Sequence, residues 1–448
     1  MTFHNRESEL KRLNESFSRN EKQLVIVFGR RRLGKTTLLR KFSQTHDAFF
    51  FSCPISTAGE ALKQFQKQMA EKFDEPILRK ATFSGWQEAL EYIFEMAIQR
   101  NTPLIFDEFP YLLKSVPGID SLLQHLWDKT DKKIWIALCG SLVSVMRDQV
   151  LAQEAPLYGR RSEVIQIRSF SFHDTGLFYP DATFVEKAYW YGFFGGIPAY
   201  AEKASSYKSP LEAIEKMILD QNGVLYQEPE FLVREELREP GAYFSILHSL
   251  ASGKTRPNEI AQDSGVPHSG INKYLDTLKR MQLVERRVPL TEKNPERSTK
   301  ALYRMADNFL QFWFRFVFPN RSIIELGRGS ILLNGLIKPD LNTFMGPVYE
   351  LICHQELNRN SRKLLGWEAV KIGRYWDHKT EVDIVVENGF SRRVAFLECK
   401  WGKQINVTKT LNTLKSKSDL IPQYAGWEKQ WHVMSRTKGS SPNHIFLG

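Results

Sequence analysis

Residues 29–36, Gly-Arg-Arg-Arg-Leu-Gly-Lys-Thr, have the types and spacing of residues that bind phosphate. They follow the apolar run Leu24–Phe28 and lead into the helix-like Thr37–Phe42, which is the strand–loop–helix context of a phosphate-binding loop. Backbone N–H groups at such a helix start face phosphates, a lysine adds positive charge that assists hydrolysis, and a threonine hydroxyl is placed to hold Mg²⁺. We therefore expect ATP and Mg²⁺ as cofactors. The expected nucleotide contacts are Gly29, Arg30, Arg31, Arg32, Leu33, Gly34, Lys35, Thr36 and Thr37.

Two acids end a second apolar stretch, Pro103–Glu108. We expect Asp107 to hold the Mg²⁺ shell, together with Thr36, and Glu108 to polarise the attacking water. The alternative is a strand capped by a solvated acidic pair. A third stretch, Lys133–Cys139, ends before Ser141, which is either a contact to the γ-phosphate or a turn residue. Three strands with polar ends at one edge predict a doubly wound α/β sheet.

Two adjacent arginines, Arg160 and Arg161, precede the strand-like stretch Glu163–Ile167. They are candidates for stabilising the charge of a cleaving γ-phosphate, either in the same chain or across a subunit boundary. A pair of surface arginines is the alternative.

Length and composition predict a soluble protein of several domains. The 448 residues, 42% of them hydrophobic, correspond to about three domains of ~150 residues. The amino terminus is polar, and no apolar run approaches the ~20 residues of a membrane helix, so we expect no secretion signal and no membrane span. Four cysteines without a C-x-x-C pair predict neither a disulfide framework nor a zinc site. A cytoplasmic location is expected.

The net charge of +11 is concentrated in the carboxyl-terminal half. Residues 1–239 are almost balanced, whereas residues 240–306 carry an excess of five positive charges and residues 360–448 an excess of seven. This asymmetry is typical of a neutral enzyme core joined to a part that binds a polyanion such as DNA. The alternative is a solvated basic face without a partner.

The first basic block, residues 241–306, predicts a winged helix-turn-helix. Three helix-like stretches precede two strand-like stretches that flank a polar loop; the stretches are Tyr243–Leu250, Pro257–Asp263, Ile271–Met281, Leu283–Val288 and Ala301–Met305. Such a unit either contacts DNA or packs against neighbouring domains. The third helix is expected to present Ser269, Asn272, Lys273 and Lys279 outward, with Arg286, Arg287 and Lys293 on or near the wing.

A second chemical site is predicted near the carboxyl terminus. The strands Thr380–Val386 and Arg393–Trp401 are joined by a turn, so their pairing brings Asp383 close to Glu398. Side chains alternate along a strand, so Glu398 and Lys400 share a face. These carboxylates can bind a metal that activates water for phosphodiester hydrolysis, with Lys400 orienting that water.

A helix over Gly346–Ile352 carries Glu350, which is a candidate for a third metal-binding acid beside Asp383 and Glu398. The alternative is a β-hairpin with a network of ion pairs on its outer face.

Taken together, these motifs resemble the archaeal-type P-loop ATPases, a family close to the signal-transduction ATPases with numerous domains. The resemblance covers nearly the whole chain, and its matching residues are Phe3, Arg6, Glu7, Glu9 and Leu10, the loop at residues 29–36, Asp107-Glu108, Gly140-Ser141, Gly159-Arg160-Arg161 and Gly195-Gly196-Ile197-Pro198.

The resemblance implies an AAA+-like P-loop sheet with a helical lid, in which Pro198 contacts the base and the amino-terminal Arg-Glu segment lies near the adenine. It further implies a winged helix-turn-helix and a restriction-endonuclease-like α/β domain of the PD-(D/E)xK type. Asp383, Glu398 and Lys400 match that pattern, although Val382 stands where a proline is usual. The implied domains are 1–168, 169–240, 241–306 and 307–448.

The resulting hypothesis is an ATP-hydrolysing, DNA-directed protein in which the nucleotide state controls a Mg²⁺-dependent deoxyribonuclease-like domain. The ATPase core is the candidate surface for forming a homo-oligomer. Two alternatives remain open. One is a regulatory ATPase whose nuclease-like domain is inactive and serves as a DNA or protein clamp. The other is a signalling scaffold that does not bind DNA.

Overall fold

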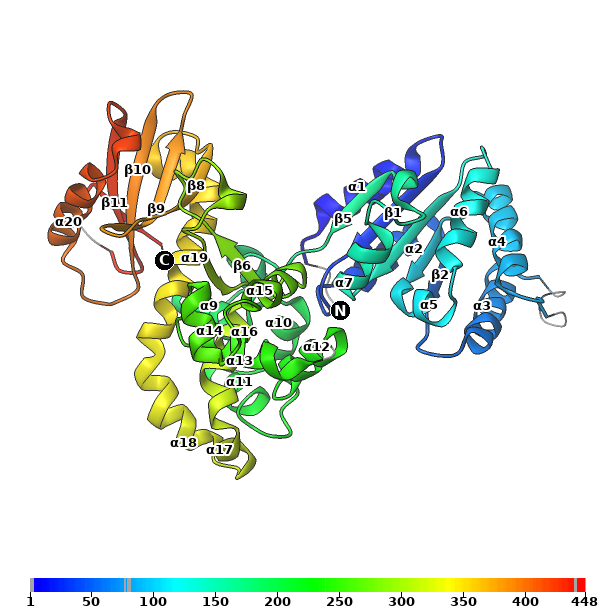
Figure 1. Ribbon diagram of the computed structural model, residues 1–448, viewed down its shortest axis with the longest axis horizontal. Helices are drawn as coiled ribbons and strands as arrows, with labels where there is room; N and C mark the ends of the chain where they lie inside the picture. Colours follow the sequence, from blue (N-terminus) through cyan, green and yellow to red (C-terminus); the bar gives the residue numbers. More distant parts are fainter. Residues whose placement is uncertain (1–3, 76–77, 79–81, 238, 439–440, 448) are drawn as a thin grey trace. The chain divides into compact units, whose positions relative to one another are not determined.

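The computed structural model describes residues 4–75, 78, 82–237, 239–438 and 441–447. The chain divides into two compact units, Met1–Ser169 and Phe170–Gly448, which are described one at a time (Figure 1). In the described ranges, no helix combines the length and the apolar character that a bilayer crossing needs.

The first unit is built around a five-stranded parallel sheet with the strand order β2-β3-β4-β1-β5. All six residues of the central strand β1 are buried, as expected where helices cover both faces of a parallel sheet. The elements of this unit are β1 (Gln23–Phe28), β2 (Phe49–Ser52), β3 (Leu104–Asp107), β4 (Trp135–Gly140), β5 (Glu163–Gln166), α1 (Glu7–Ser18), α2 (Lys35–His46), α3 (Ala58–Phe73), α4 (Trp86–Arg100), α5 (Phe109–Ser115), α6 (Ile119–Lys129) and α7 (Val143–Val145).

Aromatic side chains fill the core between this sheet and its helices. Phe106 of β3 stacks on Phe65 of α3, and Phe51 of β2 meets the same ring edge-on. On α2, Phe42 stacks on Trp135 with the ring centroids 4.6 Å apart. This packing fixes the helices against the sheet, whose strand ends carry the polar residues of the site.

The second unit begins with helices and continues into a three-helix and hairpin segment. In this segment α13, α14 and α15 are followed by the antiparallel pair β6 and β7, the order of elements predicted from the sequence. The elements up to β7 are α8 (Phe172–Thr175), α9 (Phe184–Phe194), α10 (Pro198–Ala204), α11 (Pro210–Met217), α12 (Glu228–Glu236), α13 (Pro240–Ala251), α14 (Pro257–Ser264), α15 (Ile271–Arg280), β6 (Val284–Arg287) and β7 (Leu302–Met305).

The rest of the second unit contains a mixed five-stranded sheet with the order β12-β11-β10-β9-β8. Its strands β8, β9 and β10 are antiparallel neighbours, whereas β10, β11 and β12 run parallel. The remaining elements are α16 (Asn308–Phe312), α17 (Arg321–Glu325), α18 (Gly329–Leu332), α19 (Lys338–Leu365), α20 (Val407–Asp419), β8 (Lys371–Trp376), β9 (Glu381–Asn388), β10 (Arg393–Lys400), β11 (Glu428–Ser435) and β12 (His444–Phe446).

Helices α19 and α20 pack on opposite faces of this sheet. Phe396 of β10 packs with Leu414 of α20, whereas Cys399 interacts with Cys353 of α19. Because successive side chains of a strand point to opposite faces, these two contacts place the helices on different sides. The helix that carries Glu350 therefore approaches the strands from the side opposite α20.

The long helix α19 differs from the sequence prediction, which placed a helix only over Gly346–Ile352. The observed helix covers Lys338–Leu365 and continues through Pro347. A proline lacks the N–H for an intrahelical hydrogen bond, so it favours the first turn of a helix over the interior. Tertiary packing of Phe344, Met345 and Val348, all buried, overrides that local preference.

Candidate functional site

The loop at residues 29–36 connects β1 to α2 with a backbone that only particular residues accept. Gly29 has φ +155°, and a Cβ built on it would lie 2.2 Å from the carbonyl oxygen of Ile167. Gly34 has φ +86° and precedes the first residue of α2, Lys35. The helix thus begins two residues earlier than predicted, directly at the lysine. The loop fits a phosphate group because the N–H groups at this helix start have no partner within the helix.

Lys35 and Arg6 stabilise the loop from its two sides. Lys35 is buried, and its Nζ donates to the carbonyl oxygen of Arg30 at 2.9 Å. Arg6 donates from Nη2 to the carbonyl oxygens of Leu33, at 3.3 Å, and of Arg168, at 2.5 Å. Arg6 is therefore hydrogen-bonded to the loop. The place of the Arg-Glu segment near the adenine stays a prediction, and Phe3 lies outside the described residues.

The predicted magnesium ligands of the loop lie together. Thr36 Oγ1 donates to Asp107 Oδ2 at 2.7 Å, and Asp107, at the end of β3, is buried. A hydroxyl and a carboxylate oxygen beside a phosphate loop are the hard oxygen ligands that Mg²⁺ prefers. These residues fit a magnesium–nucleotide complex, in which Thr36 and Asp107 would hold the ion.

Glu108 and Ser141 also lie together, at the ends of adjacent strands. Glu108 Oε2 accepts hydrogen bonds from the hydroxyl of Ser141 at 2.6 Å and from its backbone N–H at 3.2 Å. Glu108 itself has the left-handed backbone φ of 54° that turns the chain from β3 into α5. Ser141 thus holds the carboxylate that is predicted to polarise water.

Other predicted residues of the loop differ in their surroundings. Arg31 donates from Nη2 to the hydroxyl of Tyr111 on α5, a contact for which the sequence gives no signal. Leu33 is buried, Arg32 is exposed with φ 64°, and Thr37 is half-buried in the first turn of α2.

The sequence reasoning missed one cation beside the loop. The guanidinium of Arg147 lies over the ring of Phe28, the last residue of β1, at 5.9 Å from its centroid. Its position six residues after Ser141 could have indicated it, because the segment after β4 follows the same edge of the sheet.

The two candidate arginines after α7 have partners within the first unit. Arg160 makes a bidentate ion pair with Asp128 of α6, at 2.9 and 2.7 Å. Arg161 donates to the carbonyl oxygen of Leu151 and lies over the ring of Tyr158. Their roles in hydrolysis stay predictions.

Pro198, the other predicted nucleotide contact, is the first residue of α10 in the second unit, a position that suits proline because its missing N–H is not needed there. Its contact with the base stays a prediction.

In the carboxyl-terminal sheet, Asp383 and Glu398 lie on the adjacent strands β9 and β10. The backbone N–H of Cys399 donates to Asp383 Oδ2 at 2.9 Å. Glu398 accepts from Lys400 Nζ at 3.0 Å and from Lys417 Nζ of α20 at 3.4 Å. The hairpin therefore brings together the residues that the sequence grouped, and adds Lys417.

Glu350 of α19 faces Asp383 through an arginine. Arg374 of β8 pairs with Glu350 at 3.3 Å and lies 4.0 Å from Asp383 Oδ1. Burial, and then the nearby charges of Glu350 and Glu398, raise the pKa of Asp383 to about 7. Within the described residues, no group of three or more His, Cys, Asp or Glu is arranged to hold a metal ion, so the three-acid metal site stays a prediction.

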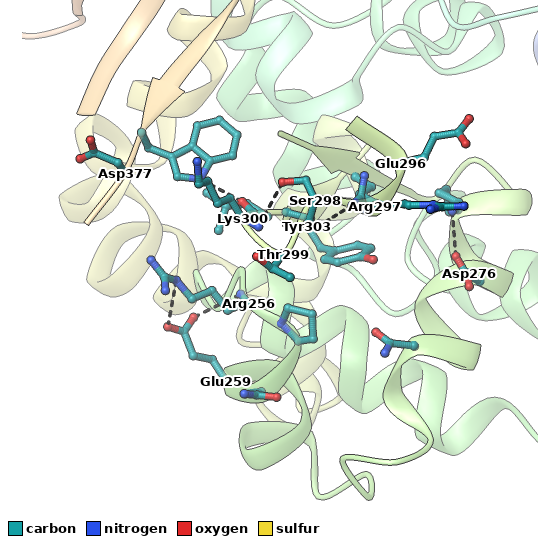
Figure 2. Close-up of a pocket in the computed structure, with 18 of the residues that line it drawn as sticks. Arg256, Glu259, Asp276, Glu296, Arg297, Ser298, Thr299, Lys300, Tyr303 and Asp377 are labelled. Atoms are coloured by element: carbon teal, nitrogen blue, oxygen red, sulfur yellow. Dashed lines mark hydrogen bonds and ion pairs between the residues drawn. The ribbon is translucent and has the colours of Figure 1, made fainter. Parts of the chain in front are cut away.

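A cleft of about 1210 Å³ lies between the three-helix and hairpin segment and the turn that joins β8 to β9. Figure 2 shows Arg256 and Glu259 on one side, the stretch at residues 296–303 on another, and Asp377 at the far left. The cleft is lined by α14, α15, the β6–β7 loop and the β8–β9 turn.

The charges of this cleft are mixed. Arg256 pairs with Glu259 at 4.0 Å, and Lys279 pairs with Asp276 at 2.8 Å. Arg286 donates to the carbonyl oxygens of Pro295 and Ser298, which shapes the hairpin loop. The predicted outward residues of the third helix, Ser269, Asn272, Lys273 and Lys279, are all exposed. Of the residues predicted on or near the wing, Lys293 is exposed, and Arg286 and Arg287 are half-buried.

Comparison with known proteins places this geometry in a family. Residues 3–204 match the ATPase domain described as predominantly from Archaea, and residues 313–413 match a family described as archaeal and bacterial proteins of unknown function. An uncharacterized protein of Methanocaldococcus jannaschii is 34% identical over 449 residues, covering 98% of this chain and 97% of that protein. An ATP-binding protein of the same organism is 48% identical over 40 residues, which is 9% of this chain and 68% of that protein.

The solved structures include a Walker-type ATPase of Pyrococcus abyssi with a TM-score of 0.54 and 22% identity, which covers 70% of this chain and 96% of that one. This likeness shows a shared fold. Together with the match of the amino-terminal ATPase domain and the full-length archaeal relative, it leads to one conclusion: the chain belongs to the archaeal-type ATPase family.

Proposed function

We propose that this protein hydrolyses ATP and that its nucleotide state controls a DNA-directed, metal-dependent nuclease-like site in its carboxyl-terminal sheet. The ATPase half is supported by the contact between Thr36 and Asp107 beside the phosphate loop. Glu108 would polarise the attacking water after Ser141 releases it, and Lys35 would turn from the carbonyl oxygen of Arg30 to the phosphates. Bound Mg²⁺ would supply the positive charge that neutralises the phosphate oxygens.

One observation carries the nuclease half of the proposal: Asp383 of β9 accepts from the backbone N–H of Cys399, the residue of β10 between Glu398 and Lys400, which pair with each other. Two carboxylates and an amine at adjacent strand positions are the groups that metal-assisted phosphodiester hydrolysis requires. A divalent cation would be held by Asp383 and Glu398, with Glu350 as a further ligand, and Lys400 would orient the water.

DNA is the proposed polyanion because the excess positive charge lies in residues 240–306 and in residues 360–448, which contain Asp383, Glu398 and Lys400. Asn272 and Lys279 of α15 line the cleft of Figure 2, and Lys273 of the same helix is exposed. Contacts from such side chains to phosphates would release counterions, so DNA affinity should fall steeply as the salt concentration rises.

A second candidate function, a regulatory ATPase whose nuclease-like sheet serves as an inactive clamp, is favoured by the ion pairs of the carboxyl-terminal acids. Glu350 and Glu398 are both paired with cations. The two candidates share the ATPase and differ in whether DNA is cut.

The test is a nuclease assay on linear, circular and single-stranded DNA with Mg²⁺ or Mn²⁺, with and without ATP. We expect metal-dependent cleavage that changes with ATP and disappears in Glu398→Ala, while Glu428→Ala, which removes an exposed carboxylate of the same sheet paired with Arg393, keeps it. Absence of cleavage in every condition, with salt-sensitive DNA binding intact, would establish the clamp instead.

A further inference from the structure

Arg374 lies among the carboxylates that the proposed function assigns to a metal ion. Its Nη1 is 3.3 Å from Glu350 Oε2, and its Nη2 is 4.0 Å from Asp383 Oδ1. The same Nη2 contacts Glu381, the first residue of β9. Burial lowers the pKa of Arg374, but the carboxylates of Glu350, Glu381 and Asp383 outweigh that effect and raise the pKa above its ordinary value. One guanidinium thus connects acids from α19 and β9.

An irregularity in the sheet brings Arg374 and Asp383 together. The pairing of β8 with β9 shifts between Gly373, opposite Val385, and Tyr375, opposite Val382. One residue of β8, Arg374, therefore faces two residues of β9, one of which is Asp383. The extra residue lies in β9, so the bulge bends β9 and re-aims its side chains, and here it places Asp383 opposite the arginine.

The three-helix and hairpin segment anchors the strand that carries Arg374. The backbone N–H of Leu290, three residues after β6, donates to the carbonyl oxygen of Arg374 at 2.9 Å. Two residues along β8, Trp376 Nε1 donates to the carbonyl oxygen of Lys300 at 3.0 Å. Gly373 leaves room for Leu290, since an added Cβ would lie 2.9 Å from Leu290 Cδ1. These contacts fix the backbone on both sides of Arg374.

A divalent cation needs the same carboxylate oxygens that Arg374 engages, because Mg²⁺ and Mn²⁺ take oxygen ligands at short range. We propose that Arg374 is a positioning residue that excludes a divalent cation from Glu350 and Asp383, and that the three-helix and hairpin segment holds it there through Leu290 and Trp376. The inference rests on the proposed metal-dependent function of these acids and assigns its control to a residue outside the PD-(D/E)xK pattern. A partner that shifts the hairpin, such as DNA in the adjoining cleft, would free the acids.

The test is a calorimetric titration of the full chain with Mn²⁺ as the probe, in the absence of nucleotide. Arg374→Met keeps the apolar stem of the side chain and removes the guanidinium. The variant should bind Mn²⁺ at least about tenfold more tightly than the wild type, because the carboxylates of Glu350 and Asp383 no longer interact with the guanidinium. The matched control is Arg393→Met, which removes the guanidinium paired with Glu428 on the same sheet and should leave Mn²⁺ binding unchanged. If Arg374→Met does not fold, Arg374→Gln carries the test.

Two results would overturn the role of Arg374: Mn²⁺ binding that is unchanged relative to the wild type, or a gain that persists when Asp383→Asn is added. The anchoring is tested separately by Trp376→Phe, which keeps an aromatic ring and removes the hydrogen bond from the indole N–H to the carbonyl oxygen of Lys300. We expect tighter Mn²⁺ binding, and unchanged binding would refute the anchor. The readout of this test is metal affinity and not DNA cleavage. A failure of DNA cleavage would therefore overturn the proposed nuclease function without deciding the role of Arg374.

Discussion

The two acidic sites of this chain hold their carboxylates in different ways. At the nucleotide loop, Asp107 accepts from the hydroxyl of Thr36, and Glu108 accepts from the hydroxyl and N–H of Ser141. These hydrogen-bond partners are uncharged groups. Such hydrogen bonds are modest in strength and readily exchanged for metal coordination.

At the carboxyl-terminal sheet, the acids lie beside cations instead. Glu350 pairs with Arg374, and Glu398 pairs with Lys400 and Lys417. Partly buried ion pairs of this kind must be separated before a metal can take their oxygens, which costs more than displacing a neutral donor. The comparison teaches that Mg²⁺ with its nucleotide would have to displace only neutral donors at the first site, whereas the metal proposed for the second site would first require its ion pairs to separate.

The largest effect is expected from removing the negative charge of Glu108. Glu108→Gln keeps the size of the side chain and its contact with Ser141, so nucleotide binding should persist while ATP hydrolysis falls by roughly 10²–10⁴-fold. Steady-state phosphate release and a binding titration measure the two. The control is Glu71→Gln on the exposed face of α3; hydrolysis that survives in Glu108→Gln would break the nucleotide side of the comparison.

The backbone of the loop provides the next effect. Gly29→Ala places a Cβ 2.2 Å from the carbonyl oxygen of Ile167, at φ +155°, so we expect a loss of about 2–4 kcal/mol in the free energy of unfolding. Gly59→Ala, with no atom within 4 Å of its new Cβ, should change stability by about 1 kcal/mol or less. Urea denaturation of both variants decides; equal stabilities would show that the close approach does not matter.

A pH titration sharpens the carboxyl-terminal side. The pKa of Asp383 is raised from 3.8 to about 7, so between these values the folded carboxyl keeps a proton that the unfolded chain has released. Stability attributable to this group therefore decreases as pH rises from 4 to 7, and is constant above. In metal-free buffer, the free energy of unfolding of the wild type should fall by about 1 kcal/mol or more relative to that of Asp383→Asn between pH 4 and pH 7. If the stability difference between the two proteins did not vary with pH, it would contradict the account in which burial and the nearby acids raise the pKa of Asp383.

The smallest change in stability is expected at Arg160. Its pair with Asp128 is largely exposed, so Arg160→Ala and Asp128→Ala should each alter the free energy of unfolding by less than about 1 kcal/mol. If Arg160 acts on the γ-phosphate as predicted, only Arg160→Ala lowers ATP hydrolysis. Equal hydrolysis rates in the two variants would leave Arg160 a surface residue.

The nucleotide site was predictable because its geometry follows from short, continuous motifs. The spacing of Gly29, Gly34 and Lys35 fixes a loop, and the acids of Asp107-Glu108 end a buried strand. Parallel strands present their carboxyl ends at one edge, so strand ends distant in sequence could be grouped before the strand order was known.

The control of the second site was not predictable. Strict alternation along β9 would put Asp383 on the same face as Val385, but the shifted pairing around Arg374 changes that relation. A bulge depends on the partner strand and not on local sequence. The pairing of Arg160 with Asp128 was missed for the same reason, since it joins segments that only the fold brings together.

The most direct measurement is an equilibrium titration with a fluorescent ATP analogue and Mg²⁺. Lys35→Ala removes the buried amine at the start of α2, and should weaken binding by about a hundredfold, because a charge-assisted contact to phosphate is lost in a desolvated site. Lys41→Ala, an exposed lysine of the same helix, should bind like the wild type. Binding by Lys35→Ala that equals the wild type would contradict the seating of a triphosphate in this loop.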